Sequence, residues 1–207
     1  MSNQKPLQIP YGVADYVKLR AFGEYYQDKT HYLPLLERSG HFLFLIRPRR
    51  FGKSLLQSMM ECYYDCNRAE AFDELFGGTW IHDHPTPERH GYLVLRLDFS
   101  RVHGCADALA DSFDRYCRIR LRAFMLRYAD DLPSGVVDLV LAEPTINSAI
   151  NALLTEMELH QTRPLYLFID EYDNFANTVL ASEGREAYRT LTHGRGFLRD
   201  FFAELKG

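Results

Sequence analysis

The stretch RPRRFGKS at residues 47–54 constrains this chain more than any other feature of its sequence. An apolar run at residues 41–46 precedes it, and residues 55–64 after it carry the apolar period of a helix. A strand, a short loop that ends in Gly-Lys-Ser and a helix form the context of a phosphate-binding P-loop. We therefore expect a strand at 41–46, a helix from Lys53 to about Asn67, and phosphate binding between them.

Each residue at the end of this loop has a physical reason to be there. The start of a helix presents unpaired N–H groups and a positive dipole end, which bind phosphate oxygens, and Gly52 lets the backbone come close because it has no Cβ. Lys53 is expected to reach the β- and γ-phosphates of ATP, and the Ser54 hydroxyl to ligate Mg²⁺. Arg47 occupies the position of the usual first glycine. The expected cofactor-binding residues are Arg49, Arg50, Phe51, Gly52, Lys53, Ser54 and Leu55.

A second motif follows a buried strand that we expect at residues 165–169. This apolar run, LYLFI, ends in Asp170 and Glu171, which is the pattern of a Walker B strand. In an open α/β sheet, ligands bind beyond the carboxyl ends of the strands, so this end can lie beside the P-loop. Asp170 is expected to hold Mg²⁺, usually through water. Glu171 is expected to be the catalytic residue that orients and deprotonates the attacking water.

The elements between the two motifs indicate an α/β fold. The run at 92–99 predicts a buried strand, the apolar spacing over 106–128 predicts a long amphipathic helix, and Thr145 is the expected N-cap of a helix to about His160. We expect a P-loop NTPase architecture, a three-layer α/β/α sandwich with a mostly parallel sheet. The arginines on the long helix could form a basic face. The preferred interpretation is that they lie on a solvated helix surface.

Residues 1–40 are expected to form a lead-in and helices that pack on an ATPase core at 41–207. Within them, Thr30 is the expected N-cap of a helix that ends near Gly40, with Pro34 in its first turn.

Composition narrows the class of protein. With 207 residues and 46% hydrophobic content, the chain can bury a sizeable core, and its net charge of −4 argues against a protein that coats nucleic acid. No run approaches the roughly 20 apolar residues of a membrane helix, and the first residues lack the apolar part of a signal peptide. We expect a cytoplasmic protein. Its four cysteines fit neither a disulfide framework nor a zinc ribbon.

The segments FLIRPRRFGKS, YLVLRLDFS and LYLFIDEYDNF, with YYQDKTHYLPLLE ahead of them, closely resemble the AAA-ATPase-like family of bacterial and archaeal proteins. The family's P-loop also reads RPRRFGKS, so Arg47 follows the family pattern. The resemblance implies phosphate binding by Gly52, Lys53 and Ser54 and a Walker B role for Asp170 and Glu171.

Two further motifs match the family without a settled role. The first is the DKT triplet at 28–30. In the preferred interpretation, Asp28 caps the following turn, and in the alternative, Lys29 contacts nucleotide. The triplet Tyr172, Asp173 and Asn174 forms a turn and helix cap or has a sensing role.

The length of the chain departs from the family. Related ATPases continue into a fourth strand with a polar sensor residue, and members of the family often carry a C-terminal nuclease-like domain. With three expected strands, the chain is expected to be a truncated gene product or a fragment. Its oligomeric state stays open, since many ATPases of this sort complete their site with a neighbour's arginine.

Three functional interpretations remain. The leading one is a P-loop NTPase that binds ATP and depends on Mg²⁺ for hydrolysis. The second is a nucleotide-gated binding or regulatory module without turnover, which could associate with nucleic acid or a partner protein. The third is a non-functional remnant with an uncovered sheet edge.

Overall fold

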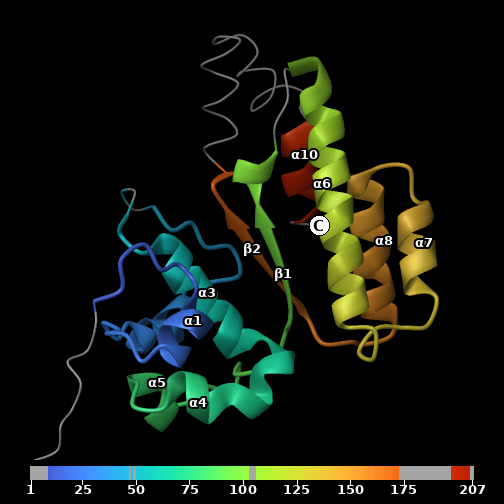
Figure 1. The fold of residues 1–207 in the computed structure, drawn as a ribbon. Helices are drawn as coiled ribbons and strands as arrows, with labels where there is room; N and C mark the ends of the chain where they lie inside the picture. Colours follow the sequence, from blue (N-terminus) through green and yellow to red (C-terminus); the bar gives the residue numbers. More distant parts are fainter. Residues whose placement is uncertain (1–8, 47, 49, 103–105, 173–196, 206–207) are drawn as a thin grey trace, which may run out of the picture. The chain divides into compact units, whose positions relative to one another are not determined.

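The computed structural model describes residues 9–46, 48, 50–102, 106–172 and 197–205. The chain forms two compact units, Met1–Leu93 and Val94–Gly207, and each is described by itself (Figure 1). The architecture is mixed α/β, with a small parallel sheet of two strands. The boundary that we expect after residue 40 stays a prediction.

The first unit is helical in the residues described. Its centre is the contact of α1 with α3, where the fully buried Tyr16 donates its backbone N–H to the Ser58 hydroxyl and its own hydroxyl to the Leu75 carbonyl. The helices are α1 (Tyr16–Ala21), α2 (Leu33–Arg38), α3 (Lys53–Tyr64), α4 (Phe72–Phe76) and α5 (Trp80–Asp83), with 3₁₀ helices at Thr30–Tyr32 and Cys66–Ala71.

The second unit contains the sheet and the longest helix. Tyr128 and Tyr116 on that helix, α6, accept hydrogen bonds from the backbone of strand β1, at Val94 (3.0 Å) and Asp98 (2.7 Å). Buried residues recur along α6 at helical spacing, as the sequence predicts. The elements are β1 (Leu93–Asp98), a 3₁₀ helix at Phe99–Arg101, α6 (Ala106–Arg127), α7 (Val136–Ala142), α8 (Ile146–Leu159), β2 (Leu165–Asp170) and α10 (Phe197–Glu204).

Helix α8 begins where the sequence predicts. The Thr145 hydroxyl accepts the N–H of Ser148, and the Ser148 hydroxyl accepts the N–H of Thr145, which makes a reciprocal capping box. Ile150, Leu153 and Met157 are buried on its inner face. The helices α7 and α10 both pack against α8.

The strand predicted at residues 41–46 is wrong for the structure. These residues form no strand, and their side chains are exposed, with Ile46 at 84% and Phe44 at 72%. A strand requires a neighbour that pairs with its backbone. Among the described residues, that pairing joins β1 to β2 and otherwise forms a bridge between Asp65 and Tyr92. The described sheet therefore has two strands instead of the predicted three, and the three-layer sandwich stays a prediction.

The N-cap predicted at Thr30 is also wrong. Thr30 lies inside the 3₁₀ helix that precedes α2, and its buried hydroxyl accepts the N–H of Ile81 at 3.1 Å. A partner 51 residues away in sequence occupies the oxygen that a cap would use. Pro34 does lie in the first turn of α2, as predicted.

Candidate functional site

Gly52 determines how the candidate phosphate loop enters α3. It is the N-cap residue and has φ +74°, in the left-handed region that favours glycine, and its carbonyl accepts the first helical bond from Leu56 at 2.9 Å. No side chain caps this helix start, and no acidic residue lies in its first turn. The backbone N–H groups at this end are therefore not taken up by a cap, and the dipole there is not neutralised by a carboxylate.

The charged residues around Gly52 are cationic. Lys53 is half-buried in the first turn of α3, and Arg50 is exposed with φ +69°. A non-glycine residue at such a φ is uncommon, and residues of this kind cluster at functional sites. Neither cation forms an ion pair with a described residue. Of the other expected binding residues, Phe51 is exposed, Ser54 and Leu55 are half-buried, and Arg49 lies outside the described residues, as does Arg47.

The expected metal and catalytic carboxylates lie at the end of β2. Asp170 is buried, and its carboxylate accepts hydrogen bonds from Arg96 of β1 (3.4 Å) and from the N–H of Glu171 (3.0 Å). Glu171 follows the strand with φ +54°, so the chain turns sharply there. Sequence reasoning missed Arg96. An arginine within an apolar strand signals a nearby carboxylate, but the register of the two strands is needed to identify it.

The two motifs belong to different units. The residues of the loop lie in the first unit and those of the carboxylate pair in the second, so their meeting at one nucleotide stays a prediction. Tyr172 is exposed, and Asp173 and Asn174 of the same triplet lie outside the described residues.

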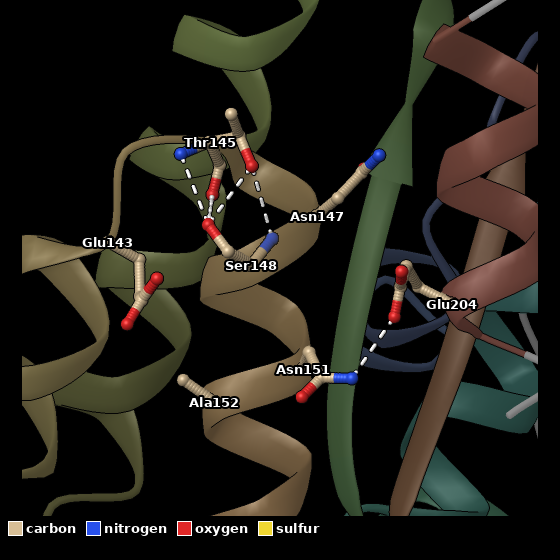
Figure 2. A pocket seen from close by; sticks show the side chains of 7 residues that line it. All are labelled: Glu143, Thr145, Asn147, Ser148, Asn151, Ala152 and Glu204. Carbon is tan, nitrogen blue, oxygen red and sulfur yellow. Dashed lines mark hydrogen bonds between the residues drawn. The ribbon is translucent and has the colours of Figure 1, made fainter. Parts of the chain in front are cut away.

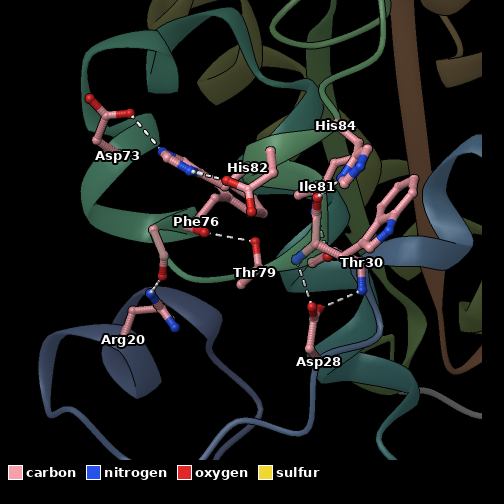
Figure 3. A network of polar contacts seen from close by, with 12 residues as sticks. Arg20, Asp28, Thr30, Asp73, Phe76, Thr79, Ile81, His82 and His84 are labelled. Carbon is pink, nitrogen blue, oxygen red and sulfur yellow. Dashed lines mark hydrogen bonds and ion pairs between the residues drawn. The ribbon is translucent and has the colours of Figure 1, made fainter.

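The DKT triplet is anchored in the first unit by hydrogen bonds to the start of α5 (Figure 3). The Asp28 carboxylate accepts the N–H of Thr30 and the N–H of Trp80, both at 2.8 Å. Burial alone would raise the pKa of Asp28, but these N–H groups lower it below its ordinary value. Asp28 therefore organises the following turn, which confirms the preferred interpretation of this residue, and the contact of Lys29 with nucleotide stays a prediction.

Near this network, His82 bridges two carboxylates on the surface (Figure 3). Its Nε2 lies 3.1 Å from Asp73 and its Nδ1 lies 3.3 Å from Asp83. Hydrogen bonds to Asp73 and then Asp83 raise the pKa of His82. No group of three or more His, Cys, Asp or Glu residues in the described chain is arranged to hold a metal ion.

A polar groove of about 430 Å³ lies in the second unit, where α8 begins and α10 ends (Figure 2). The Thr145 and Ser148 hydroxyls on its wall are engaged in the capping box, and Asn151 donates to Glu204 at 3.1 Å. Thr145, Ser148, Asn151 and Glu204 therefore serve a helix cap and helix packing, while the buried Oδ1 of Asn147 has no hydrogen-bond partner among the described residues. The groove contains none of the predicted site residues.

The cavity beside the P-loop is smaller, at about 200 Å³, and its walls are largely apolar. Gly52, Leu55 and Leu56 line it from the loop and α3, and Lys29 lines it from the DKT triplet.

No helix among the described residues is long and apolar enough to cross a membrane.

Comparison with known proteins identifies the family. Residues 10–207 match the family described as "Predicted AAA-ATPase". The chain is also 29% identical over 212 residues to "Uncharacterized protein in vnfD 5'region" of Azotobacter chroococcum mcd 1, an alignment that covers 92% of this chain and 34% of the relative. No solved structure matches significantly. Because the family match spans nearly the whole chain, this protein belongs to the AAA-ATPase-like family, which implies a P-loop fold and a nucleotide ligand.

Proposed function

We propose that this chain is a P-loop domain that binds ATP at the start of α3. The observation that carries the proposal is the helix start itself, with Gly52 in the left-handed conformation and no side-chain cap. Lys53 and Ser54 follow directly, in a turn without acidic residues. Such a start attracts phosphate through N–H groups, helix dipole and lysine charge together.

Each expected metal ligand has the chemistry that a magnesium ion prefers, and their meeting at one ion is part of the proposal. Mg²⁺ prefers hard oxygen ligands, and the Ser54 hydroxyl and the Asp170 carboxylate are oxygen donors of this kind. Bound there with the phosphates, the ion would neutralise charge that develops during phosphoryl transfer. Glu171 is the expected base that orients and deprotonates a water molecule for hydrolysis.

One observation favours the second candidate, a nucleotide-binding module without turnover. Arg96 and the N–H of Glu171 already use the Asp170 carboxylate, so a metal ion would compete with an existing ion pair. Support for nucleic acid binding is weaker, because two of the arginines of α6 serve the fold. Arg118 pairs with Asp114 at 2.7 Å, and Arg120 donates to the Arg96 carbonyl at 3.3 Å.

Two substitutions test the proposal. Lys53→Ala is expected to weaken ATP binding by about 10- to 100-fold and to abolish stabilisation by ATP at concentrations near the wild-type Kd, because it removes a charge-assisted phosphate contact. Glu171→Gln is expected to retain ATP binding and to lose phosphate release. Binding of labelled ATP and release of phosphate with excess Mg²⁺ measure the two effects.

Lys18→Ala is the matched control for Lys53, since Lys18 is an exposed lysine of the same unit that pairs with Asp15. Equal binding of labelled ATP by wild type and Lys53→Ala would show that the loop is wrongly assigned. Intact binding with no phosphate release, with or without DNA, would favour the module. DNA binding that weakens with salt would show that the arginines contact nucleic acid.

The relative from Azotobacter chroococcum is about three times as long as the segment it shares with this chain. The hydrolytic activity and any nucleic acid partner therefore belong to the proposal for the complete protein. The same is true of assembly into a homo-oligomer.

A further inference from the structure

Lys29 is a half-buried lysine at the edge of the candidate P-loop. Its Nζ lies 3.9 Å from the position that a Cβ atom on Gly52 would occupy. Lys29 and Gly52 also line the same cavity of about 200 Å³, together with Leu55 and Leu56 from the first turn of α3. The ammonium group is therefore placed where the chain comes closest to the expected phosphates.

The neighbours of Lys29 fix its backbone. Asp28 accepts the N–H groups of Thr30 and Trp80, and the Thr30 hydroxyl accepts the N–H of Ile81. The side chains on both sides of Lys29 therefore form hydrogen bonds with the backbone at the start of α5. Lys29 is the member of the triplet whose side chain reaches the cavity. The hydrogen bonds of Asp28 and Thr30 therefore hold the backbone from which the Lys29 side chain extends.

The charge of Lys29 has no counter-charge among the described residues. No carboxylate of the described residues lies within ion-pair distance of its Nζ, and each carboxylate oxygen of Asp28 accepts a backbone N–H. Of the described residues that line the cavity, Lys29 is the single one that carries a charge. Partial burial beside apolar walls strengthens the attraction between such a cation and an anionic ligand.

We propose that Lys29 binds the phosphate chain of the nucleotide beside Gly52, in addition to Lys53. The inference rests on the proposed function, because it assumes a nucleotide at this loop. The lysine is a point charge on a flexible stem, which suits a contact with phosphate oxygens. Its role is binding and positioning.

The experiment compares ATP, ADP and adenosine as ligands of the full chain. Lys29→Gln is expected to weaken ATP binding by about 10- to 100-fold, because a charge-assisted hydrogen bond is lost. The loss should be smaller for ADP and absent for adenosine, which has no phosphate. Lys29→Arg should restore part of the ATP affinity, since it restores the charge.

Two variants guard against a folding defect. Lys18→Gln removes an exposed lysine of the same unit and should bind all three ligands as wild type does. Lys29→Met keeps the apolar stem and should show the same selective loss as Lys29→Gln, with an unchanged thermal midpoint in the absence of ligand.

The results separate this inference from the proposed function. ATP binding by Lys29→Gln and Lys29→Met at wild-type strength, with Lys53→Ala defective, would overturn the role of Lys29 and leave the P-loop assignment standing. Equal loss of ATP and adenosine would also overturn it, because Lys29 would then shape the cavity. Wild-type binding by Lys53→Ala would overturn the loop assignment, and the Lys29 proposal with it.

Discussion

The two ends of α3 differ in how their terminal backbone groups are hydrogen-bonded. At the C-terminal end, the carbonyls of Tyr63 and Tyr64 accept the N–H groups of His90 (2.9 Å) and Tyr92 (3.1 Å). The N-terminal end begins at Gly52 without a side-chain cap. One end is closed by the protein's own backbone, and the other presents its N–H groups at the candidate P-loop.

Under the proposed function, this difference separates a structural helix end from an end that binds phosphate. Unpaired backbone groups cost stability, and the start of α8 is capped by Thr145. Helix α7 also begins without a side-chain cap, at Gly135, but its first turn carries Asp138, whereas the first turn of α3 has no acidic residue. An uncapped start next to cationic residues is stabilised when an anion binds. The asymmetry of α3 is therefore the structural basis of the proposed function, and three substitutions can test it.

The largest effect is expected from Gly52→Ala. The new Cβ would stand where the backbone must approach the phosphates, and losing two charge-assisted hydrogen bonds of about 1.5–3 kcal/mol each predicts a fall in ATP affinity of at least about 100-fold. The left-handed φ of +74° adds a stability cost of about 1–2 kcal/mol. Titration with ATP and thermal unfolding measure the two effects.

Gly135→Ala is the matched control for this substitution. Gly135 is also the N-cap of a helix, α7, with φ +82° and open space around the position of a Cβ. It should lose a similar stability and keep ATP binding. If both variants lose affinity equally, backbone strain explains the effect and the open end of α3 does not.

A smaller effect is expected from Thr145→Ala at the closed start of α8. Removing the hydroxyl breaks the capping box and should lower the free energy of unfolding by about 0.5–2 kcal/mol, with ATP affinity unchanged. Denaturant unfolding and ATP titration measure this. Thr145→Ser keeps the hydroxyl and is the control, and a loss of ATP binding by Thr145→Ala would break the distinction between the two helix starts.

The smallest effect concerns the closed end of α3, where the His90 ring lies 3.1 Å from the Asp65 carbonyl. Burial lowers the pKa of His90 below its ordinary value of about 6.5. Below about pH 6.5, the unfolded chain therefore takes up a proton that the folded chain resists, and stability falls as pH falls toward the lower, folded pKa.

His90→Asn should reduce this loss of stability at acidic pH. Asparagine tolerates the φ of +56° at this position, and the backbone bond to Tyr63 remains. Thermal midpoints of wild type and variant between about pH 7.5 and about pH 5 provide the measurement. Parallel pH profiles for the two proteins would contradict the assignment of this loss to His90.

Local signals in the sequence predict several elements well. The N-cap Thr145, the apolar spacing of α6 and the runs that become β1 and β2 are local signals. Each acts within one element, so a single stretch of sequence is enough to predict it. Gly52 at the start of α3 belongs to the same group. The resemblance to the family adds the expected roles of the loop residues and of the two carboxylates.

What sequence reasoning missed depends on partners far along the chain. Thr30 has the chemistry of an N-cap, but the N–H of Ile81 takes its oxygen. The pair of Arg96 with Asp170 requires the register of two strands. For Lys29, a nucleotide contact is the second interpretation of the sequence, and the placement of this lysine beside Gly52 requires the packing of the whole first unit. The run at 41–46 has the composition of a strand, but pairing with a neighbour decides whether a strand forms.

The contacts of Asp28 and Thr30 with α5 also fix an order of events during synthesis. Their partners, the N–H groups of Trp80 and Ile81, leave the ribosome about fifty residues later, and the P-loop lies between them. Closing so long a loop costs entropy before any contact offsets it. Lys29 therefore reaches its place beside Gly52 after α5 has been made, and in a nascent chain that ends at α3 the candidate P-loop is present before Lys29 is fixed beside it.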